Sequence, residues 1–422
     1  MKTTEDTAFH APRSGGSFEV FLVFLRLGLT AFGGPVAHLG YFREAFVTRR
    51  RWLTDTAYAD LVALCQFLPG PASSQVGMAI GLQRAGLPGL IAAWIGFTLP
   101  SAVLLIAVAL GIDALGDVSQ AGWVLGLKAA AVAVVAHAVL GMTTSLVTDA
   151  RRATLTAAAA ISVLLVPGIF TQVIVIAVAG LIGLIWLDRS NHPSASADRS
   201  TATQDPARPE RHPGFLAVRV PRWVAVASLA SFGALLAGLP LAAAWFGSGT
   251  VGLFDIFYRA GALVFGGGHV VLPLLEAETV QTGLVDSGDF LAGYGVAQAV
   301  PGPLFTFAGF LGAASNGSPS GVFGGVIALV AIFLPAALLV VGVLPYWERI
   351  RGIPRIRRAL GGVNAGVVGI LGAALYDPVF TAGVTGPGSL AIAIAGFTAL
   401  TAWRAPAWAV VIVAAALGWA LL

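Results

Sequence analysis

Charged residues are scarce in this sequence. Asp, Glu, Lys and Arg make up 10% of its 422 residues, whereas a soluble domain carries roughly 25%. Hydrophobic residues make up 57%. The net charge of +4 gives no reason to expect a nucleic-acid partner, because the basic residues sit in short loops. The composition therefore indicates a protein that works inside a lipid bilayer.

Cysteine and enzyme motifs are also scarce or absent. The single cysteine, Cys65, allows no internal disulfide. The first 17 residues are polar, so we expect no cleavable signal peptide. The sequence lacks a Walker A loop, a dinucleotide-binding G-x-G-x-x-G, H-E-x-x-H, C-x-x-C and a Ser-His-Asp set. We therefore expect no enzyme activity, no cofactor and no metal, and an ion gradient would have to drive any active transport.

Long apolar runs are abundant. Residues 87–112, 121–147, 223–245 and 322–344 each exceed the roughly 20 residues that cross a bilayer. The 53 glycines and 23 prolines are tolerated in membrane helices. The sequence thus predicts an all-α, polytopic integral membrane protein.

The chain also repeats itself. R-L-G-L-T-A-F-G-G at 26–34 returns as R-A-G-A-L-V-F-G-G at 259–267, and Q-F-L-P-G-P at 66–71 returns as Q-A-V-P-G-P at 298–303. Two further segments recur in the same order, F-T-L-P-S-A as I-F-L-P-A-A and G-L-K-A-A-A-V as G-V-N-A-G-V-V. Four anchors in one order indicate an internal duplication.

The duplication divides the chain into five segments. We expect a cytoplasmic tail at 1–17, a first repeat at 18–187, a polar cytoplasmic linker at 188–222, an extra membrane helix at 223–249 and a second repeat at 250–422. The linker is rich in Ser, Pro, Ala and charge, so it is too polar to fold alone.

Loop charges predict that the two repeats are inverted. The loop after the first F-G-G is basic and its counterpart is acidic: Arg43, Arg49, Arg50 and Arg51 against Glu276, Glu278, Asp286 and Asp289. Basic loops stay in the cytoplasm, and the extra helix would turn the second repeat over. Each F-G-G and each P-G-P unit must then return to its starting side as a hairpin of short helices. This gives about ten to thirteen membrane helices, the broken ones included.

The broken segments are candidate substrate sites, because interruptions at matching positions of two repeats point to a site between them. Proline suits the first position of a helix, so helices should begin after Gly70 and Gly302. A helix start attracts anions, and Ser73, Ser74 and Thr306 could add hydroxyl donors. The alternative is that these glycines and prolines serve only close packing or a kink.

Charged residues near the breaks also leave two interpretations open. Arg26 and Arg259 stand about a turn and a half before each F-G-G, and the guanidinium fork suits a tetrahedral oxyanion. They could instead snorkel to an interface or neutralise Glu19 or Asp255. Lys128 could snorkel, or act as a counter-charge or proton-coupling group. His38 and His269 are further candidates for proton coupling.

At these residues the chain resembles the chromate ion transporter family, long-chain bidomain type. The resemblance rests on F-G-G-P at 32–35 with R-x-W-L at 50–53, Q-F-L-P-G-P at 66–71, F-G-G-G-H at 265–269 and A-Q-A-V-P-G-P at 297–303. It covers nearly the whole chain except the linker and the tail. One departure is that the second repeat has G-G-G-H where the first has G-G-P, so the two copies are not equivalent.

The resemblance implies proton-coupled export of chromate and resistance to chromate. It also implies location in a bacterial inner membrane, and it leaves open whether the protein forms a homodimer. Its functional positions fall on Arg26, Phe32, Gly33, Gly34, Pro35, Gln66, Pro69, Gly70, Pro71, Arg259, Phe265, Gly266, Gly267, Gln298, Pro301, Gly302 and Pro303. The two glutamines could equally cap or bridge helices. A carrier of sulfate or another oxyanion, a passive anion channel and a membrane scaffold remain alternatives.

Overall fold

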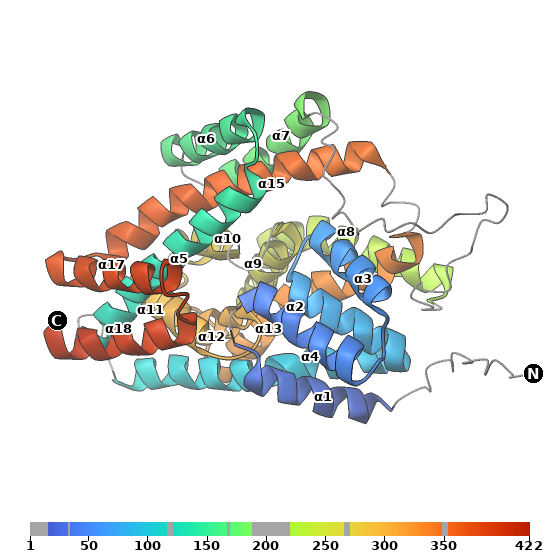
Figure 1. Cartoon of the computed structure of the whole chain (residues 1–422), viewed down its shortest axis with the longest axis horizontal. Coiled ribbons are helices and arrows are strands. Elements are labelled where there is room, and N and C mark those ends of the chain that lie inside the picture. The colour runs from blue at the N-terminus through green and yellow to red at the C-terminus, as the bar shows by residue number, and fades with distance from the viewer. Residues whose placement is uncertain are drawn as a thin grey trace, which may run out of the picture.

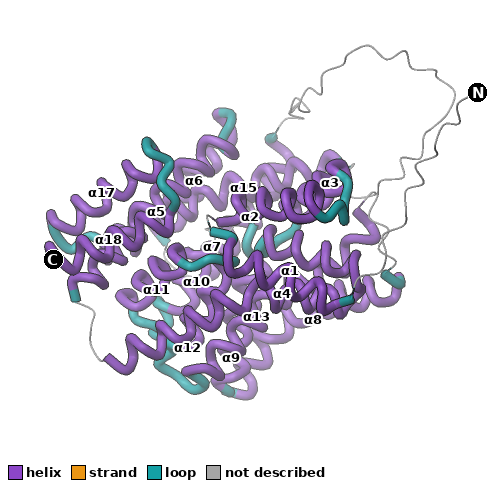
Figure 2. The backbone as a smooth tube through the Cα atoms, turned by 60° about the horizontal axis from the view of Figure 1, so that its bottom comes forward, coloured by secondary structure: helices purple, strands orange, loops and turns teal. Residues whose placement is uncertain are grey.

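The described part of the chain is mostly helical, with short loops between the helices. The computed structural model describes residues 16–32, 34–115, 121–166, 169–187, 220–265, 271–347 and 353–422, and these contain no strand (Figures 1 and 2). The first repeat comprises α1 (Ser17–Thr30), α2 (Gly34–Arg43), the π-helix η1 (Glu44–Arg49), α3 (Asp55–Phe67), α4 (Ala72–Leu115), α5 (Gly122–Leu146), α6 (Ala150–Leu165) and α7 (Ile169–Trp186).

The second repeat follows the extra helix α8 (Arg222–Phe246). It comprises α9 (Gly249–Leu263), α10 (Val271–Thr279), α11 (Ser287–Ala299), the 3-10 turn η3 (Leu304–Thr306), α12 (Phe307–Ala313), α13 (Gly321–Val343), η4 (Leu344–Tyr346), α15 (Pro354–Ala374), the π-helix η5 (Leu375–Phe380), α16 (Thr381–Gly383), α17 (Pro387–Thr401) and α18 (Ala407–Leu421). The short helices on either side of the repeated motifs therefore recur, as α1, α2 and α3 in the first repeat and as α9, α10 and α11 in the second.

Five helices in the described ranges are long and apolar enough to cross a membrane: Ala72–Ile112, Gly122–Leu146, Arg222–Phe246, Gly321–Tyr346 and Pro354–Gly383. Four shorter apolar helices accompany them. Only 6% of the most apolar stretch of α8 is buried inside the protein. One face of this helix packs on α9 and α13, and the rest of it exposes apolar side chains. A polytopic membrane protein built only of helices is confirmed.

The helices on either side of each break are short. α1 has 14 residues, α2 has 10 and α3 has 13. At 1.5 Å per residue, a helix of about 14 residues spans roughly 21 Å, less than the roughly 30 Å of the hydrocarbon core. Single helices of this length cannot cross a bilayer, as the hairpin prediction requires.

Helix α4 is in fact a hairpin of two helices. Ala85 and Gly86 have non-helical dihedral angles, and Gly86 has φ +65°. A Cβ atom on Gly81 would stand 2.8 Å from that of Ala93, so the arm before the turn folds back on the arm after it. α12 and α13 repeat this contact, because a Cβ on Gly312 would stand 2.6 Å from that of Ala328.

The two repeats exchange their last helices. α6 and α7 of the first repeat pack on α15 of the second, while α17 and α18 of the second pack on α5 of the first (Figure 1). Glycines permit both contacts: Gly126 of α5 lies against the Ala414 carbonyl, and Gly362 of α15 lies against the Ala179 carbonyl. Such small residues let membrane helices approach closely. The two repeats are therefore intertwined.

Candidate functional site

The broken segments of the two repeats are hydrogen-bonded to each other. The Gly70 N–H donates to the Val264 carbonyl at 2.7 Å, and the Gly302 N–H donates to the Ala31 carbonyl at 3.0 Å. Gly70 and Gly302 are the central residues of the two P-G-P motifs, and Ala31 and Val264 each precede an F-G-G. Each P-G-P loop thus binds the F-G-G segment of the other repeat, and all four breaks meet between the repeats.

Glycine is required at the centre of both P-G-P loops. Gly70 has φ +117° and Gly302 has φ +108°, values that side chains with a Cβ rarely adopt. A Cβ on Gly302 would stand 2.7 Å from Ser101 Oγ, and one on Gly70 would stand 2.9 Å from Gln75 Nε2. Both the backbone twist and the close approach exclude other residues.

Helices begin directly after both P-G-P motifs. α4 begins at Ala72, and Ser73 and Ser74 in its first turn are each 3% exposed. Ser74 Oγ is buried and has no hydrogen-bond partner among the described residues. The second loop differs, because Thr306 Oγ1 donates to the Pro303 carbonyl at 2.6 Å. The serine hydroxyl of the first repeat remains able to donate, whereas the threonine hydroxyl of the second is already used.

His38 contacts two of the four breaks, and the carbonyl that it binds also binds a third. Its ring is 1% exposed, with Nε2 3.1 Å from the Ala31 carbonyl and Nδ1 3.4 Å from Ser73 Oγ. A carbonyl only accepts hydrogen bonds, so Nε2 carries a proton and donates it. The Ala31 carbonyl therefore accepts from both His38 and Gly302. A proton added at Nδ1 would remove the acceptor that faces Ser73.

Arg26 is exposed at the surface of the protein. Its side chain lines a cavity of about 260 Å³ formed by α1, α2, η1 and the residue after η1. The polar residues of this cavity are Arg26, Thr30, Tyr41, Glu44, Arg49 and Arg50. Arg49 Nε donates to Glu44 Oε1 at 2.8 Å. Arg26 and Arg50 have no acidic partner among the described residues.

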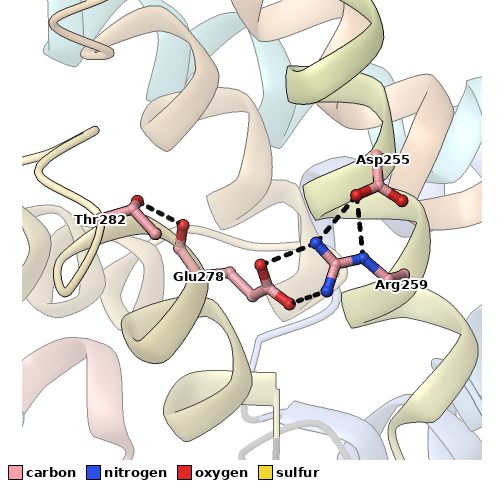
Figure 3. A network of polar contacts seen from close by, with 4 residues as sticks. All are labelled: Asp255, Arg259, Glu278 and Thr282. Atoms are coloured by element: carbon pink, nitrogen blue, oxygen red, sulfur yellow. Dashed lines mark hydrogen bonds and ion pairs between the residues drawn. The ribbon is translucent and has the colours of Figure 1, made fainter. Parts of the chain in front are cut away.

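Arg259, the equivalent of Arg26, is held by two carboxylates (Figure 3). Its Nε donates to Asp255 Oδ2 at 3.0 Å, and its two Nη atoms donate to the two Glu278 oxygens, Nη2 at 3.0 Å. The side chains of Asp255 and Glu278 are only 6% and 7% exposed. Pairing with Asp255 was one interpretation left open by the sequence, but Glu278 was not anticipated as a partner.

Lys128 does not snorkel to an interface. It is 5% exposed, and a Cβ on Gly288 would stand 3.0 Å from its Nζ. Its charge is therefore buried within the protein, against the first turn of α11. The structure thus removes the snorkelling interpretation and leaves the counter-charge and coupling hypotheses.

The remaining predicted residues differ from one another in their exposure and in their contacts. Gln66 is exposed, whereas Gln298 is partly buried and hydrogen-bonded to Tyr294. Phe32 contacts Trp408 of α18, with ring centroids 5.8 Å apart. Gly34 begins α2 with φ +77° and Pro35 follows it, while Phe265, Pro69, Pro71 and Pro301 lie in the breaks themselves. Gly33, Gly266, Gly267 and His269 lie outside the described residues.

Sequence reasoning named Asp255 as one possible partner of Arg259 but overlooked Glu278 as the second. The signal was present in the alignment of the two repeats. An offset of 233 residues places Leu22 opposite Asp255 and Ala45 opposite Glu278. Both acidic residues align with apolar residues of the first repeat. The two repeats have therefore diverged at these positions.

Repeated broken helices that meet between intertwined repeats define a multi-pass membrane protein of the transporter kind. The chain belongs to the chromate transporter family, which matches residues 18–184 and 251–419.

Several relatives align over most of their length. The chromate transport protein of Pseudomonas aeruginosa is 29% identical over an alignment of 436 positions, which covers 99% of this chain and 95% of that protein. The probable chromate transport protein of Synechococcus elongatus is 27% identical, over 88% of this chain and 86% of that protein. The chromate transport protein of Cupriavidus metallidurans is 26% identical, over 87% and 84%. No solved structure matches the chain.

Proposed function

We propose that this protein is a secondary active transporter that exports chromate across the bacterial inner membrane and thereby confers chromate resistance. Membership of the chromate transporter family and the names of its relatives support the substrate. The structural observation that carries the proposal is the crossed pair of hydrogen bonds, Gly70 to Val264 and Gly302 to Ala31. These bonds bring the start of α4 to the boundary between the repeats, where alternating access requires the substrate site.

The chemistry of this boundary suits an oxyanion. The start of a helix carries about half a positive charge and unpaired N–H groups. Ser74 Oγ adds a buried hydroxyl without a partner among the described residues. Outside the boundary, in the first repeat, Arg26 adds an exposed guanidinium about a turn and a half before the first F-G-G. Sulfate or another tetrahedral dianion presents the same charge and shape, so it is the alternative substrate.

The membrane potential favours export of such a dianion. Two negative charges that leave a cell across 100 mV, inside negative, release about 4.6 kcal/mol. This energy sustains a concentration ratio of roughly 10³. Coupling to protons would add to this driving force, and His38, Lys128 and His269 are the proposed coupling groups. A homodimer is compatible with this function but is not required by it.

Transport into everted membrane vesicles tests the proposal. We expect energised vesicles that contain the protein to accumulate radiolabelled chromate above its external concentration. An uncoupler should abolish this accumulation, and sulfate and molybdate should compete according to their affinities. Stronger competition by sulfate than by unlabelled chromate would indicate a sulfate carrier. Because the membrane potential alone would drive a dianion through a passive channel, the deciding measurement uses K⁺ and valinomycin to collapse the potential while the pH gradient remains. Continued accumulation is expected for a proton-coupled exporter, whereas equilibration under this condition would indicate a passive channel and contradict the proposal.

A further inference from the structure

The two equivalent arginines of this protein differ in the charged groups around them. Arg26 and Arg259 occupy the same position of the repeated motif. When the repeats are aligned, Asp255, one turn before Arg259, corresponds to Leu22, and Glu278 corresponds to Ala45. The first repeat therefore lacks both carboxylates that neutralise Arg259 in the second.

The guanidinium of Arg259 is already occupied by anions. Glu278 takes both Nη atoms in the bidentate manner that a free oxyanion would use. Asp255 takes the remaining Nε edge, and Nη2 lies 2.8 Å from its Oδ2. The cluster combines two carboxylates with one guanidinium, and Asp255 Oδ1 is buried without a partner in the part of the chain that the structure describes. Carboxylate oxygens thus take four of the five N–H groups of this guanidinium. A further anion finds at most one donor there and is repelled by two carboxylates.

The equivalent region of the first repeat is open and positive. Arg26 borders the cavity of about 260 Å³ together with Arg49, Arg50 and Glu44. Three guanidinium groups and one carboxylate give this cavity a net charge of +2, which matches a dianion. A water molecule occupies roughly 30 Å³ in the liquid, so a five-atom oxyanion fits with several waters. Arg49 is tied to Glu44, which leaves Arg26 and Arg50 as ligands and Tyr41 as a hydroxyl donor.

A simpler explanation of this charge difference is the positive-inside rule, which makes loops basic on one side of a membrane. Asp255 and Glu278 do not fit that explanation. They are buried, with 4% and 5% exposure, and both bind one arginine rather than solvent. Burying two carboxylates at one guanidinium is costly, and a topology signal does not require it.

We propose that each chain binds one oxyanion in the Arg26 cavity of the first repeat, and that Asp255 and Glu278 close the equivalent site of the second repeat as internal anions. The ligand class rests on the proposed function, whereas the choice of repeat rests on the two arginine environments. The repeats then have different tasks. The first repeat loads the anion, and the second offers no equivalent site that would retain it.

Equilibrium dialysis of radiolabelled chromate against the purified full-length protein in lipid nanodiscs tests this assignment. We expect one equivalent of chromate per chain. Arg26→Gln should weaken binding about 10- to 100-fold, because a charged hydrogen-bond donor is lost. Arg43→Gln is the matched control and should bind as the wild type does, because Arg43 pairs with Asp55 at the surface of the same segment.

The second repeat is tested by removing its internal anions. The double variant Asp255→Asn with Glu278→Gln should bind a second equivalent of chromate, and adding Arg259→Gln should remove it again. Two equivalents or none in the wild type, or unchanged binding in Arg26→Gln, would overturn the assignment. If the double variant does not yield a monodisperse protein, the Arg26→Gln result alone decides.

The vesicle experiment separates this assignment from the proposed function. Active chromate export by the wild type together with undiminished chromate binding by Arg26→Gln would refute the site and leave the function intact. Chromate binding that depends on Arg26 without any accumulation in vesicles would refute active export and leave the site intact.

Discussion

At the scale of single residues, the central position of each P-G-P motif requires glycine for two reasons, a positive φ angle and close neighbouring atoms. We predict that Gly302→Ala lowers the thermal unfolding temperature and abolishes transport, because φ +108° costs a residue with a Cβ roughly 1–2 kcal/mol. The new Cβ would also press on Ser101 Oγ at 2.7 Å. Gly372→Ala is the control, since nothing lies within 4 Å of a Cβ there. Equal effects of the two substitutions would contradict the crossed arrangement.

The matched arginines make a second prediction at the residue scale. Arg259→Gln should destabilise the detergent-solubilised protein by about 3–5 kcal/mol, because it leaves two buried carboxylates without their partner. Arg26→Gln should leave the unfolding temperature nearly unchanged, because Arg26 is exposed and lacks an acidic partner in the described part of the chain. Thermal unfolding monitored by fluorescence would measure both. A larger loss in Arg26→Gln would mean that the two environments are wrongly assigned.

At the scale of helices, the exchanged contacts depend on small residues that face a partner's backbone. We predict that Gly126→Val destabilises the protein by about 1–3 kcal/mol, the usual cost of overpacking, because the added side chain collides with the Ala414 carbonyl on α18. Gly141→Val lies on the same helix, where nothing surrounds a Cβ, and should have little effect. Comparable losses from both would show that α18 does not pack on α5 in this way.

At the scale of the whole molecule, the intertwined repeats should not function apart. We predict that a chain cut within the linker, at residues 188–222, regains chromate export only when both parts are produced together. α6 and α7 need α15, and α17 and α18 need α5, so each part alone exposes unfilled helix contacts. Vesicle transport with one part, the other, and both would measure this. Full activity of either part alone would refute the exchange of helices.

The inverted orientation of the repeats is a further prediction at this scale. Single cysteines at positions 50 and 353 should react with an impermeant thiol reagent from the cytoplasmic side, and one at 283 from the opposite side. Replacing the buried Cys65 gives a suitable background. Labelling of positions 50 and 283 from one side would end the inverted-repeat hypothesis.

Much of the architecture could be predicted because it depends on local chemistry. Apolar runs such as 87–112 and 121–147 predict membrane helices, and the structure has helices there. The prolines and glycines of the P-G-P motifs predict interruptions, and helices begin at Ala72 and Leu304. The snorkelling of Lys128 was a wrong interpretation, because periodicity on one helix does not show that α11 covers it.

The sequence by itself determined the membrane class, the duplication and the positions of the breaks, because composition and backbone chemistry act within a few residues. Only the tertiary structure decided which break binds which, through Gly70 with Val264 and Gly302 with Ala31. It likewise decided that Glu278 neutralises Arg259 while Arg26 borders an open cavity. These outcomes depend on distances between segments far apart in the chain, and no local pattern specifies such distances.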